Sequence, residues 1–255
     1  MPKNNDGLLN LVFNIDCLEL LSKIEDESID LIATDPPYNL SYNGRGKINS
    51  FNCFLNDSLT SEEHGIWFDT VLRELHRVLK QDSAIYVFTD YRKYPMFYVL
   101  MEQYFNIKNC IVWDKMSIGM GQQYRFQHEF IIYAIKGKAK LNIDKRNVSD
   151  IWHIKRDNVR KYKHPTQKPL ELFDRIIKYS SKKGDIVLDP FVGSGTSAVS
   201  AFSNSRYFIG SDVDKNYCEV AVERLKENGY TDDVYNLDTE QKNYEETIEY
   251  GEDGE

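Results

Sequence analysis

The feature that most constrains this chain is its repeated alternation of short apolar runs with segments of helical periodicity. Strand-like runs lie at residues 9–15, 29–34, 84–89, 108–113, 129–135, 185–189 and 207–212. Apolar residues recur with helical spacing between several of these runs, as in 61–80 and 215–228. Strands that alternate with helices are typical of a doubly wound, mostly parallel sheet. We therefore expect an α/β fold.

The length and the distribution of charge suggest one domain with an insert and a tail. We expect a single domain over 1–229, a basic insert at about 137–163, and an acidic, flexible tail over 230–255. From Lys136 to Lys183 there are 15 Lys or Arg residues against 5 Asp or Glu, whereas 227–255 holds 11 acids and 1 base. The net charge of −8 thus hides a basic segment that can meet a phosphate backbone.

Several classes of protein are disfavoured by the sequence. No run of about 18 uncharged apolar residues is present, so no membrane partner is expected. The first residues carry no apolar secretory core. The four cysteines, Cys17, Cys53, Cys110 and Cys218, are far apart and form no Cys-x-x-Cys pair. We therefore expect a cytoplasmic protein without a disulfide framework and without a metal.

The tetrapeptide Asp35-Pro36-Pro37-Tyr38 directly follows the strand-like run 29–34. Two prolines hold the backbone extended and cannot continue a ladder of hydrogen bonds, so their carbonyl groups stay available as acceptors. A carboxylate, these carbonyls and an aromatic ring could together hold a flat heterocycle that carries an amino group. The alternative is a rigid turn between a strand and a loop.

A second motif, Asp189-Pro-Phe-Val-Gly193-Ser-Gly195, joins a strand to a helix. Its glycines allow a ligand to approach the backbone closely, and the new helix offers free N–H groups. Asp212 ends the next strand, 17 residues after Gly195, where an acid suits the two hydroxyls of a ribose. The pattern predicts a cofactor that contains a nucleoside, with a purely structural turn as the alternative. NAD and FAD are disfavoured because Asp35–Tyr38 has no role in hydride transfer.

Together the two motifs resemble those of the S-adenosylmethionine-dependent DNA amino methyltransferases. We call the Asp189–Gly195 motif the glycine loop. The order of the motifs, with Asp35–Tyr38 before the glycine loop, resembles the permuted β group of that family. His164-Pro-Thr-Gln-Lys-Pro169 and Asn14-Ile-Asp-Cys17 are similar to two further motifs of the group. The resemblance implies a permuted Rossmann-like methyltransferase fold with a small target-recognition insert. It also implies S-adenosylmethionine as the cofactor and double-stranded DNA as the partner.

The resemblance further implies which residues hold the cofactor. Asp212 would bind the ribose, and Asp16 and Cys17 would lie near the adenine. The remaining positions would surround the methionine part of the cofactor; they are Thr166, Gln167, Lys168, Asp189, Phe191, Gly193, Ser194, Gly195 and Thr196. The alternatives are a helix-entry turn at 164–165 and a small core residue at Cys17.

The chemistry expected of Asp35–Tyr38 follows from the weak nucleophilicity of an exocyclic amine, whose lone pair is delocalised into the base. The Asp35 carboxylate and the Pro36 carbonyl can accept hydrogen bonds from the two N–H groups of this amine. They would thereby direct its lone pair toward a methyl group. Tyr38 would stack on the base, which must leave the duplex to reach a buried site. An Asp at the first position of the motif resembles the adenine-N6 type, with a cytosine-N4 enzyme as the alternative.

The basic insert falls where the β group carries its target-recognition region. Candidates for phosphate contacts are Arg146, Lys155, Arg156, Arg160, Lys161 and Lys163. An ordinary solvated loop is the alternative. The loops 39–59 and 116–125, or a second subunit in a homodimer, are further candidates for recognition of the site.

We therefore predict a site-specific DNA adenine-N6 methyltransferase of the restriction-modification kind. A cognate restriction endonuclease that acts on the same site is left open as a partner. A methyltransferase for RNA or protein amides and a catalytically silent DNA-binding module are the remaining alternatives.

Overall fold

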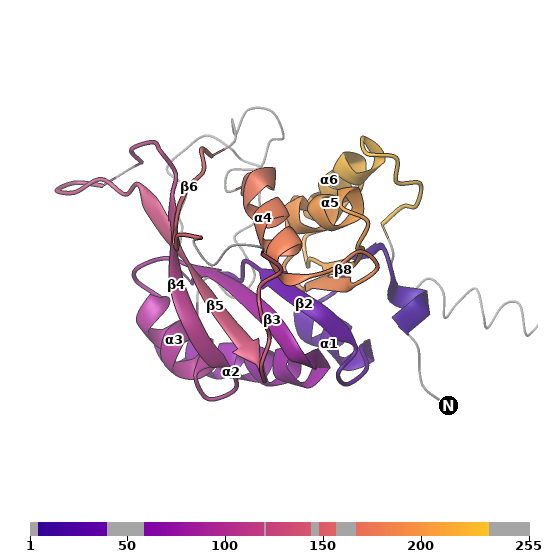
Figure 1. Ribbon diagram of the computed structural model, residues 1–255, viewed down its shortest axis with the longest axis horizontal. Coiled ribbons are helices and arrows are strands. Elements are labelled where there is room, and N and C mark those ends of the chain that lie inside the picture. Colours follow the sequence, from indigo (N-terminus) through magenta and orange to yellow (C-terminus); the bar gives the residue numbers. More distant parts are fainter. Residues whose placement is uncertain (1–4, 40–58, 120, 144–147, 157–166, 235–255) are drawn as a thin grey trace, which may run out of the picture.

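The computed structural model describes residues 5–39, 59–119, 121–143, 148–156 and 167–234. Within them, eight strands form one sheet in the order β1-β8-β7-β2-β3-β5-β4-β6. β5 runs antiparallel to its neighbours β3 and β4, and the other adjacent pairs are parallel. Helices lie on both sides of this sheet (Figure 1). The prediction of a doubly wound, mostly parallel α/β fold is confirmed.

The strands are β1 Leu11–Phe13, β2 Ile29–Thr34, β3 Leu79–Thr89, β4 Asn106–Asp114, β5 His128–Lys136, β6 Ile151–His153, β7 Ile186–Asp189 and β8 Tyr207–Ser211. The helices are α1 Cys17–Lys23, α2 Ser61–Val78, α3 Tyr94–Met101, α4 Leu170–Ser180, α5 Thr196–Ser203 and α6 Lys215–Lys226, preceded by a 3-10 turn at Asn5–Leu8.

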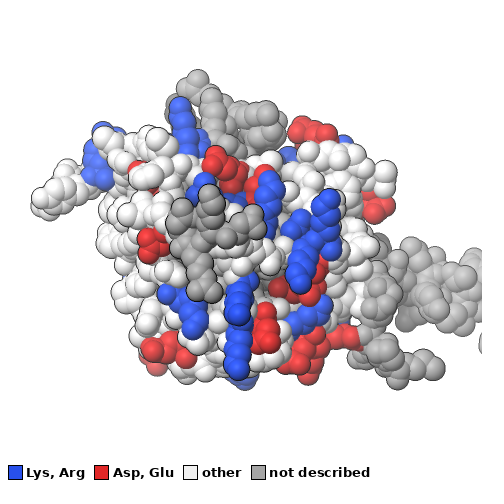
Figure 2. All heavy atoms as spheres, in the orientation of Figure 1, with Lys and Arg blue, Asp and Glu red and all other residues white. Residues whose placement is uncertain are grey.

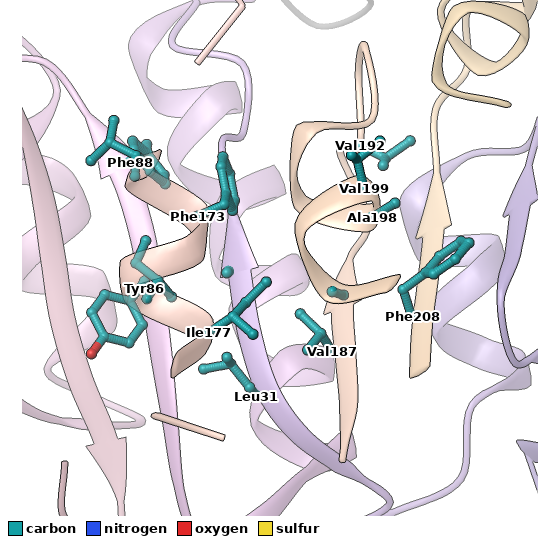
Figure 3. Close-up of a cluster of buried hydrophobic side chains, with 14 of the residues drawn as sticks. Leu31, Tyr86, Phe88, Phe173, Ile177, Val187, Val192, Ala198, Val199 and Phe208 are labelled. Carbon is teal, nitrogen blue, oxygen red and sulfur yellow. The ribbon is translucent and has the colours of Figure 1, made fainter. Parts of the chain in front are cut away.

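Two hydrophobic clusters, one on each face of the sheet, form the core. Successive side chains of β2 alternate between them, because neighbouring residues of a strand point to opposite faces. Leu31 and Ala33 join the cluster under α4, α5 and α6, whereas Ile32 joins the cluster under α1, α2 and α3. Figure 3 shows part of the first cluster, where residues of α4 and α5 pack onto the sheet.

The order of the strands places a topological switch point between β2 and β7. From β2 the chain crosses through α2 to β3, and from β7 it crosses through α5 to β8 on the opposite side. Crevices at such points, outside the carboxyl ends of parallel strands, are where α/β sheets bind ligands. The carboxyl ends of β2 and β7 are joined directly, because Thr34 Oγ1 donates a 2.7 Å hydrogen bond to Asp189 Oδ1.

Some local expectations differ from the structure. The helix-entry turn considered for 164–165 lies outside the described residues, and residues 167–169 are non-helical, so that α4 begins at Leu170. β6 lies inside the basic insert, where the sequence shows weak periodicity. It is a three-residue strand that depends on pairing with β4. Ile66 on α2 is 64% exposed, although it shares the apolar spacing of that helix. In the described part of the chain, no helix has the length and apolar character needed to cross a membrane.

The opposite environments of Leu75 and Ile66 on α2 allow a matched test of the core. Leu75 lies on the inner face of α2 and is fully buried. Leu75→Ala should lower the free energy of unfolding by about 2–5 kcal/mol, because it removes buried methyl groups and leaves a cavity. Ile66→Ala should change it by less than about 0.5 kcal/mol. Urea denaturation of both variants measures the difference, and equal losses would show that α2 does not pack as described.

Candidate active site

Asp35 follows the last residue of β2, and both of its carboxylate oxygens are engaged. The Tyr38 hydroxyl donates a hydrogen bond to Oδ1. The Lys168 ammonium donates a hydrogen bond to Oδ2 at 2.5 Å. A carboxylate held from two sides keeps one orientation, and a quarter of this side chain still reaches solvent.

Lys168 lies between two carboxylates and is only 8% exposed. Besides Asp35, its Nζ contacts Glu129 Oε2 of β5 at 3.2 Å. Glu129 Oε1 in turn pairs with Lys115 Nζ at 2.9 Å. We call Asp35, Lys168, Glu129 and Lys115 the ion cluster. Its alternating charges partly offset the cost of burying them.

The charges of the ion cluster reinforce one another. Burial alone would lower the pKa of Lys168, but the carboxylates of Asp35 and Glu129 outweigh it and raise that pKa above its usual value. Burial would raise the pKa of Glu129, yet the two ammonium groups of Lys168 and Lys115 lower it. Lys168 and Glu129 therefore stay ionised around neutral pH.

Tyr38 completes the Asp35–Tyr38 motif with a neutral hydroxyl. Burial, together with the negative charge of Asp35, raises the pKa of Tyr38 well above its usual value. The hydroxyl thus remains a donor to Asp35. The Lys168 ammonium lies 5.8 Å from the centre of the Tyr38 ring, and Phe97 of α3 meets the ring edge-on at 6.5 Å.

A buried histidine on α2 fixes the proline turn. His64 Nε2–H donates a 3.0 Å hydrogen bond to the carbonyl of Pro37. The His64 ring stacks on Trp67, with 5.5 Å between centroids. Trp67 then meets Phe191 of the glycine loop edge-on at 5.8 Å. These contacts link the two motifs on the side opposite the ion cluster. The Pro37 carbonyl already accepts a hydrogen bond from His64.

The glycine loop is stabilised from the side of α6. Gly195 has φ of 80° and precedes α5, and a Cβ on it would lie 2.6 Å from the Ala221 Cβ of α6. Arg224, also on α6 and buried, donates to the Ser194 carbonyl and to Thr196 Oγ1. The close contact with α6 thus requires glycine at position 195, and the buried Arg224 guanidinium holds the loop through hydrogen bonds.

Asp189 lies beneath the loop and accepts three hydrogen bonds. One is the Thr34 bond described above; the others come from Ser197 Oγ at 2.5 Å and from the Phe191 N–H at 3.1 Å. Burial raises the pKa of Asp189 to about 7, although these hydrogen bonds lower it in part. Its carboxylate therefore joins β2, the loop and α5.

Asp212, directly after β8, lies beside the glycine loop. Its Oδ2 accepts from the Gly193 N–H at 3.1 Å, and its Oδ1 accepts from the Asp214 N–H at 2.9 Å. Burial raises its pKa to about 6. Asn14 supports the same turn, since its Nδ2 donates to the carbonyls of Asp212 and Val213, each at 3.0 Å.

Asp16 and Cys17, the two residues predicted to lie near the adenine, have structural contacts at the start of α1. The Asp16 carboxylate caps this helix by accepting from the Leu18 N–H at 2.8 Å. Cys17 is buried in the cluster under α1–α3, and burial raises its thiol pKa above the usual value. Thr166 lies outside the described residues, and Gln167 precedes Lys168 just ahead of α4.

One hollow, partly open to solvent, brings the two motifs together. Asp35 and Lys168 lie on one side of it, and the glycine loop lies on the other. Its full lining is Asp35, Lys168, Phe173, Asp189, Phe191, Val192, Gly193, Ser194, Thr196 and Ser197. The sequence pattern missed Glu129, Lys115, His64 and Arg224, because no local motif marks them and their contacts are made by residues distant in the chain.

The predicted phosphate contacts are described only in part. Lys155 and Arg156 are exposed just after β6, whereas Arg146, Arg160, Lys161 and Lys163 lie outside the described residues. On the face drawn in Figure 2, Lys and Arg side chains are interleaved with Asp and Glu. The described residues on that face thus carry mixed charge.

Comparison with known proteins places this chain in a family. The sequence model of the DNA methylase family N6_N4_Mtase matches residues 29–223. The chain is 36% identical over 236 residues to the type II methyltransferase M.HpaI of Haemophilus parainfluenzae, covering 82% of this chain and 71% of that protein. It is 32% identical over 244 residues to the DNA adenine methyltransferase YhdJ of Escherichia coli K12, covering 82% and 80%.

Solved structures share the fold. The crystal structure of the M1.HpyAVI–SAM complex matches with a TM-score of 0.64 and 25% identity, over 84% of this chain and 98% of that chain. The cytosine-N4-specific PvuII DNA methyltransferase matches with a TM-score of 0.68 and 18% identity, over 86% and 87%, which bears on the fold alone. The expected Rossmann-like methyltransferase fold is confirmed. With a family match that includes Asp35–Tyr38, the glycine loop and Asp212, the chain belongs to the N6/N4 family of DNA methylases.

Proposed function

We propose that this protein transfers a methyl group from S-adenosylmethionine to the N6 amine of adenine at specific sites in double-stranded DNA. The observation that carries the proposal is the shared hollow at the switch point, with Asp35 on one side and the glycine loop on the other. An acid at the first position of the motif favours adenine, and YhdJ is named an adenine methyltransferase.

The residues around the glycine loop suit the proposed cofactor. When bound, S-adenosylmethionine supplies an electrophilic methyl group on its sulfonium. Asp212 carries a carboxylate that can accept from ribose hydroxyls, and the N–H groups at the start of α5 suit a carboxylate. Phe191, held edge-on against Trp67, offers an apolar wall for the methionine part. Asp16 and Cys17 are proposed for the adenine side.

On the substrate side, the proposed acceptors are Asp35 and the Pro36 carbonyl. The Pro37 carbonyl already accepts from His64, which leaves Pro36 as the acceptor next to Asp35. The Tyr38 hydroxyl occupies Asp35 Oδ1 in this structure, where the amine of a base would donate. We propose that an arriving base displaces this hydroxyl and that the Tyr38 ring then stacks on the base. Holding the amine in this way supplies positioning and electrostatic stabilisation.

Lys168 is proposed to act on Asp35. The resemblance implies a place beside the cofactor, and Lys168 does line the hollow. Its ammonium, however, is held by the Asp35 and Glu129 carboxylates. A fixed cation holds the Asp35 carboxylate in one orientation while its other oxygen receives the amine.

The proposed DNA partner would lie along the carboxyl edge of the sheet, where Lys155 and Arg156 follow β6. Flipping of the target base is part of the proposal, because the hollow lies within the protein. The type II names of the relatives support a pairing with a restriction endonuclease of the same specificity. Cytosine N4 is the second candidate substrate, because the family model that matches the chain is named for both N6 and N4 methylases.

Replacement of Asp35 tests the catalytic proposal. Asp35→Ala should lower the rate of methyl transfer by at least about 10²–10³-fold, because an acceptor aimed at the amine is lost. Mass spectrometry of nucleosides from DNA treated with the unchanged protein should show N6-methyladenine. Calorimetry should show that the variant still binds S-adenosylmethionine. Near-normal transfer by the variant would refute the role of Asp35, and N4-methylcytosine would refute the choice of base.

From the raised pKa of Asp212 we expect the affinity for the cofactor to depend on pH. Because its pKa is raised to about 6, the carboxylate is ionised at pH 7.5 and protonated at pH 5. A protonated acid is a poorer acceptor, so affinity for S-adenosylmethionine should fall as pH is lowered through about 6. Asp212→Asn should bind about tenfold more weakly at pH 7.5, in line with the loss of a hydrogen bond to a charged group, and should lack this transition.

Calorimetric titrations between pH 5 and 7.5 measure both effects. A transition that persists in Asp212→Asn would assign it to another group, of which Asp189, with a pKa near 7, is the nearest candidate.

A further inference from the structure

The connection between β4 and β5 forms a hairpin loop at the carboxyl edge of the sheet. β4 is parallel to β6 and antiparallel to β5, which is antiparallel to β3, so β4 and β3 end at the same edge. That edge also carries Asp35, after β2. The loop, residues 115–127 without the undescribed position 120, projects away from the sheet (Figure 1). We call it the β4–β5 hairpin.

The hairpin has an ordered backbone that depends on glycine. Lys115 N–H donates to the Gln127 carbonyl at 2.9 Å, and Gly119 N–H donates to the Phe126 carbonyl at 2.7 Å. Arg125 Nε donates to the Gly119 carbonyl at 2.7 Å. A Cβ on Gly119 would lie 2.6 Å from the Phe126 oxygen, which no side chain could accommodate without a shift. The two arms of the hairpin are therefore paired closely.

Large apolar side chains are exposed on this hairpin. Tyr124 is 91% exposed, and Met116 and Ile118 are each 59% exposed. Phe126 stacks on Tyr91, which lies just beyond β3, with 5.2 Å between centroids, and both rings are exposed as well. Single exposed apolar residues are common on protein surfaces, whereas a group of them marks an interaction site.

The base of the hairpin belongs to the ion cluster. Lys115, its first residue, pairs with Glu129 across the two arms, and Glu129 pairs with Lys168, which holds Asp35. The base of the hairpin is thus connected through three ion pairs to the candidate catalytic carboxylate. The hairpin therefore starts beside the ion cluster, at the edge of the sheet that also carries Asp35.

Cations accompany the apolar side chains. The Arg92 guanidinium lies 5.7 Å from the centre of the Tyr91 ring, and Arg125 lies next to Tyr124 in the hairpin. His153 at the end of β6 contacts Asp114, at the base of the hairpin, at 2.9 Å, and Lys155 follows it. Apolar tips flanked by Lys and Arg suit a duplex, where phosphates meet the cations and base planes meet the apolar groups.

We propose that the β4–β5 hairpin enters the DNA duplex at the target base and that Tyr124, with Met116 and Ile118, fills the space which the flipped base leaves. This inference rests on the proposed function. Apolar side chains that enter between base pairs in this way offset part of the cost of unstacking. A second copy of the chain on the same surface is the competing occupant, and the flanking arginines favour the polyanion.

The test compares Tyr124→Ala with Tyr207→Ala on two DNA substrates. Tyr207 is 44% exposed at the start of β8, on the opposite edge of the sheet. One duplex carries the site that the enzyme methylates in cells, and the other carries the same target base opposite an abasic position. On the paired duplex, kcat/KM of Tyr124→Ala should fall about tenfold, as expected for the loss of stacking on one base. On the abasic duplex, where the base is already unpaired, the loss should shrink to less than about twofold. Tyr207→Ala should match the unchanged protein on both.

Three results would overturn the proposal. Unchanged kcat/KM on the paired duplex would show that Tyr124 takes no part in flipping. An equal loss on both duplexes would assign Tyr124 to ordinary DNA contact. A shift from dimer to monomer in sedimentation of Tyr124→Ala would assign the hairpin to contact between subunits. Absence of methyl transfer by the unchanged protein on both substrates would instead refute the proposed function, and the hairpin proposal with it.

Discussion

The ion pairs from Lys168 to Asp35 and Glu129 are the interaction on which the site depends. They join three segments that are far apart in the sequence: the turn after β2, the start of β5 and the approach to α4. Removing one partner from such a buried group leaves an uncompensated charge, which is far more costly than the pair is stabilising. The cluster therefore fixes the orientation of the Asp35 carboxylate, and through Lys115 it also fixes the base of the β4–β5 hairpin.

The topology of the sheet explains why this cluster meets the glycine loop. β2 and β7 are adjacent and parallel, and their connections leave in opposite directions, so the space above their carboxyl ends is not covered by a crossover helix. Asp35 and Asp189 stand at those two ends. Asp189 is buried and uses its carboxylate to tie the loop to Thr34 and Ser197, whereas Asp35 lines the open side. Two acids at the carboxyl ends of neighbouring strands thus have different environments.

The fold could be predicted from sequence because apolar periodicity is a local property that strands and helices share across α/β proteins. The meeting of Asp35 with the glycine loop could also be predicted, since both motifs follow strands of one sheet. Glu129, His64 and Arg224 could not, because their contacts depend on how strands and helices pack. Glu129 reaches Lys168 only through the antiparallel placement of β5 beside β3. The roles of the individual cofactor residues, among them Asp16 and Cys17, stay predictions.

Replacement of Lys168 by Met tests the central claim that this lysine acts through Asp35. The account predicts that Lys168→Met loses methyl transfer by at least about tenfold in kcat, because a charge that orients the carboxylate is removed, while its affinity for S-adenosylmethionine stays within about twofold. Circular dichroism and thermal melting check that the variant folds. A loss of cofactor affinity with kcat unchanged would contradict the account and would return Lys168 to the cofactor side of the hollow.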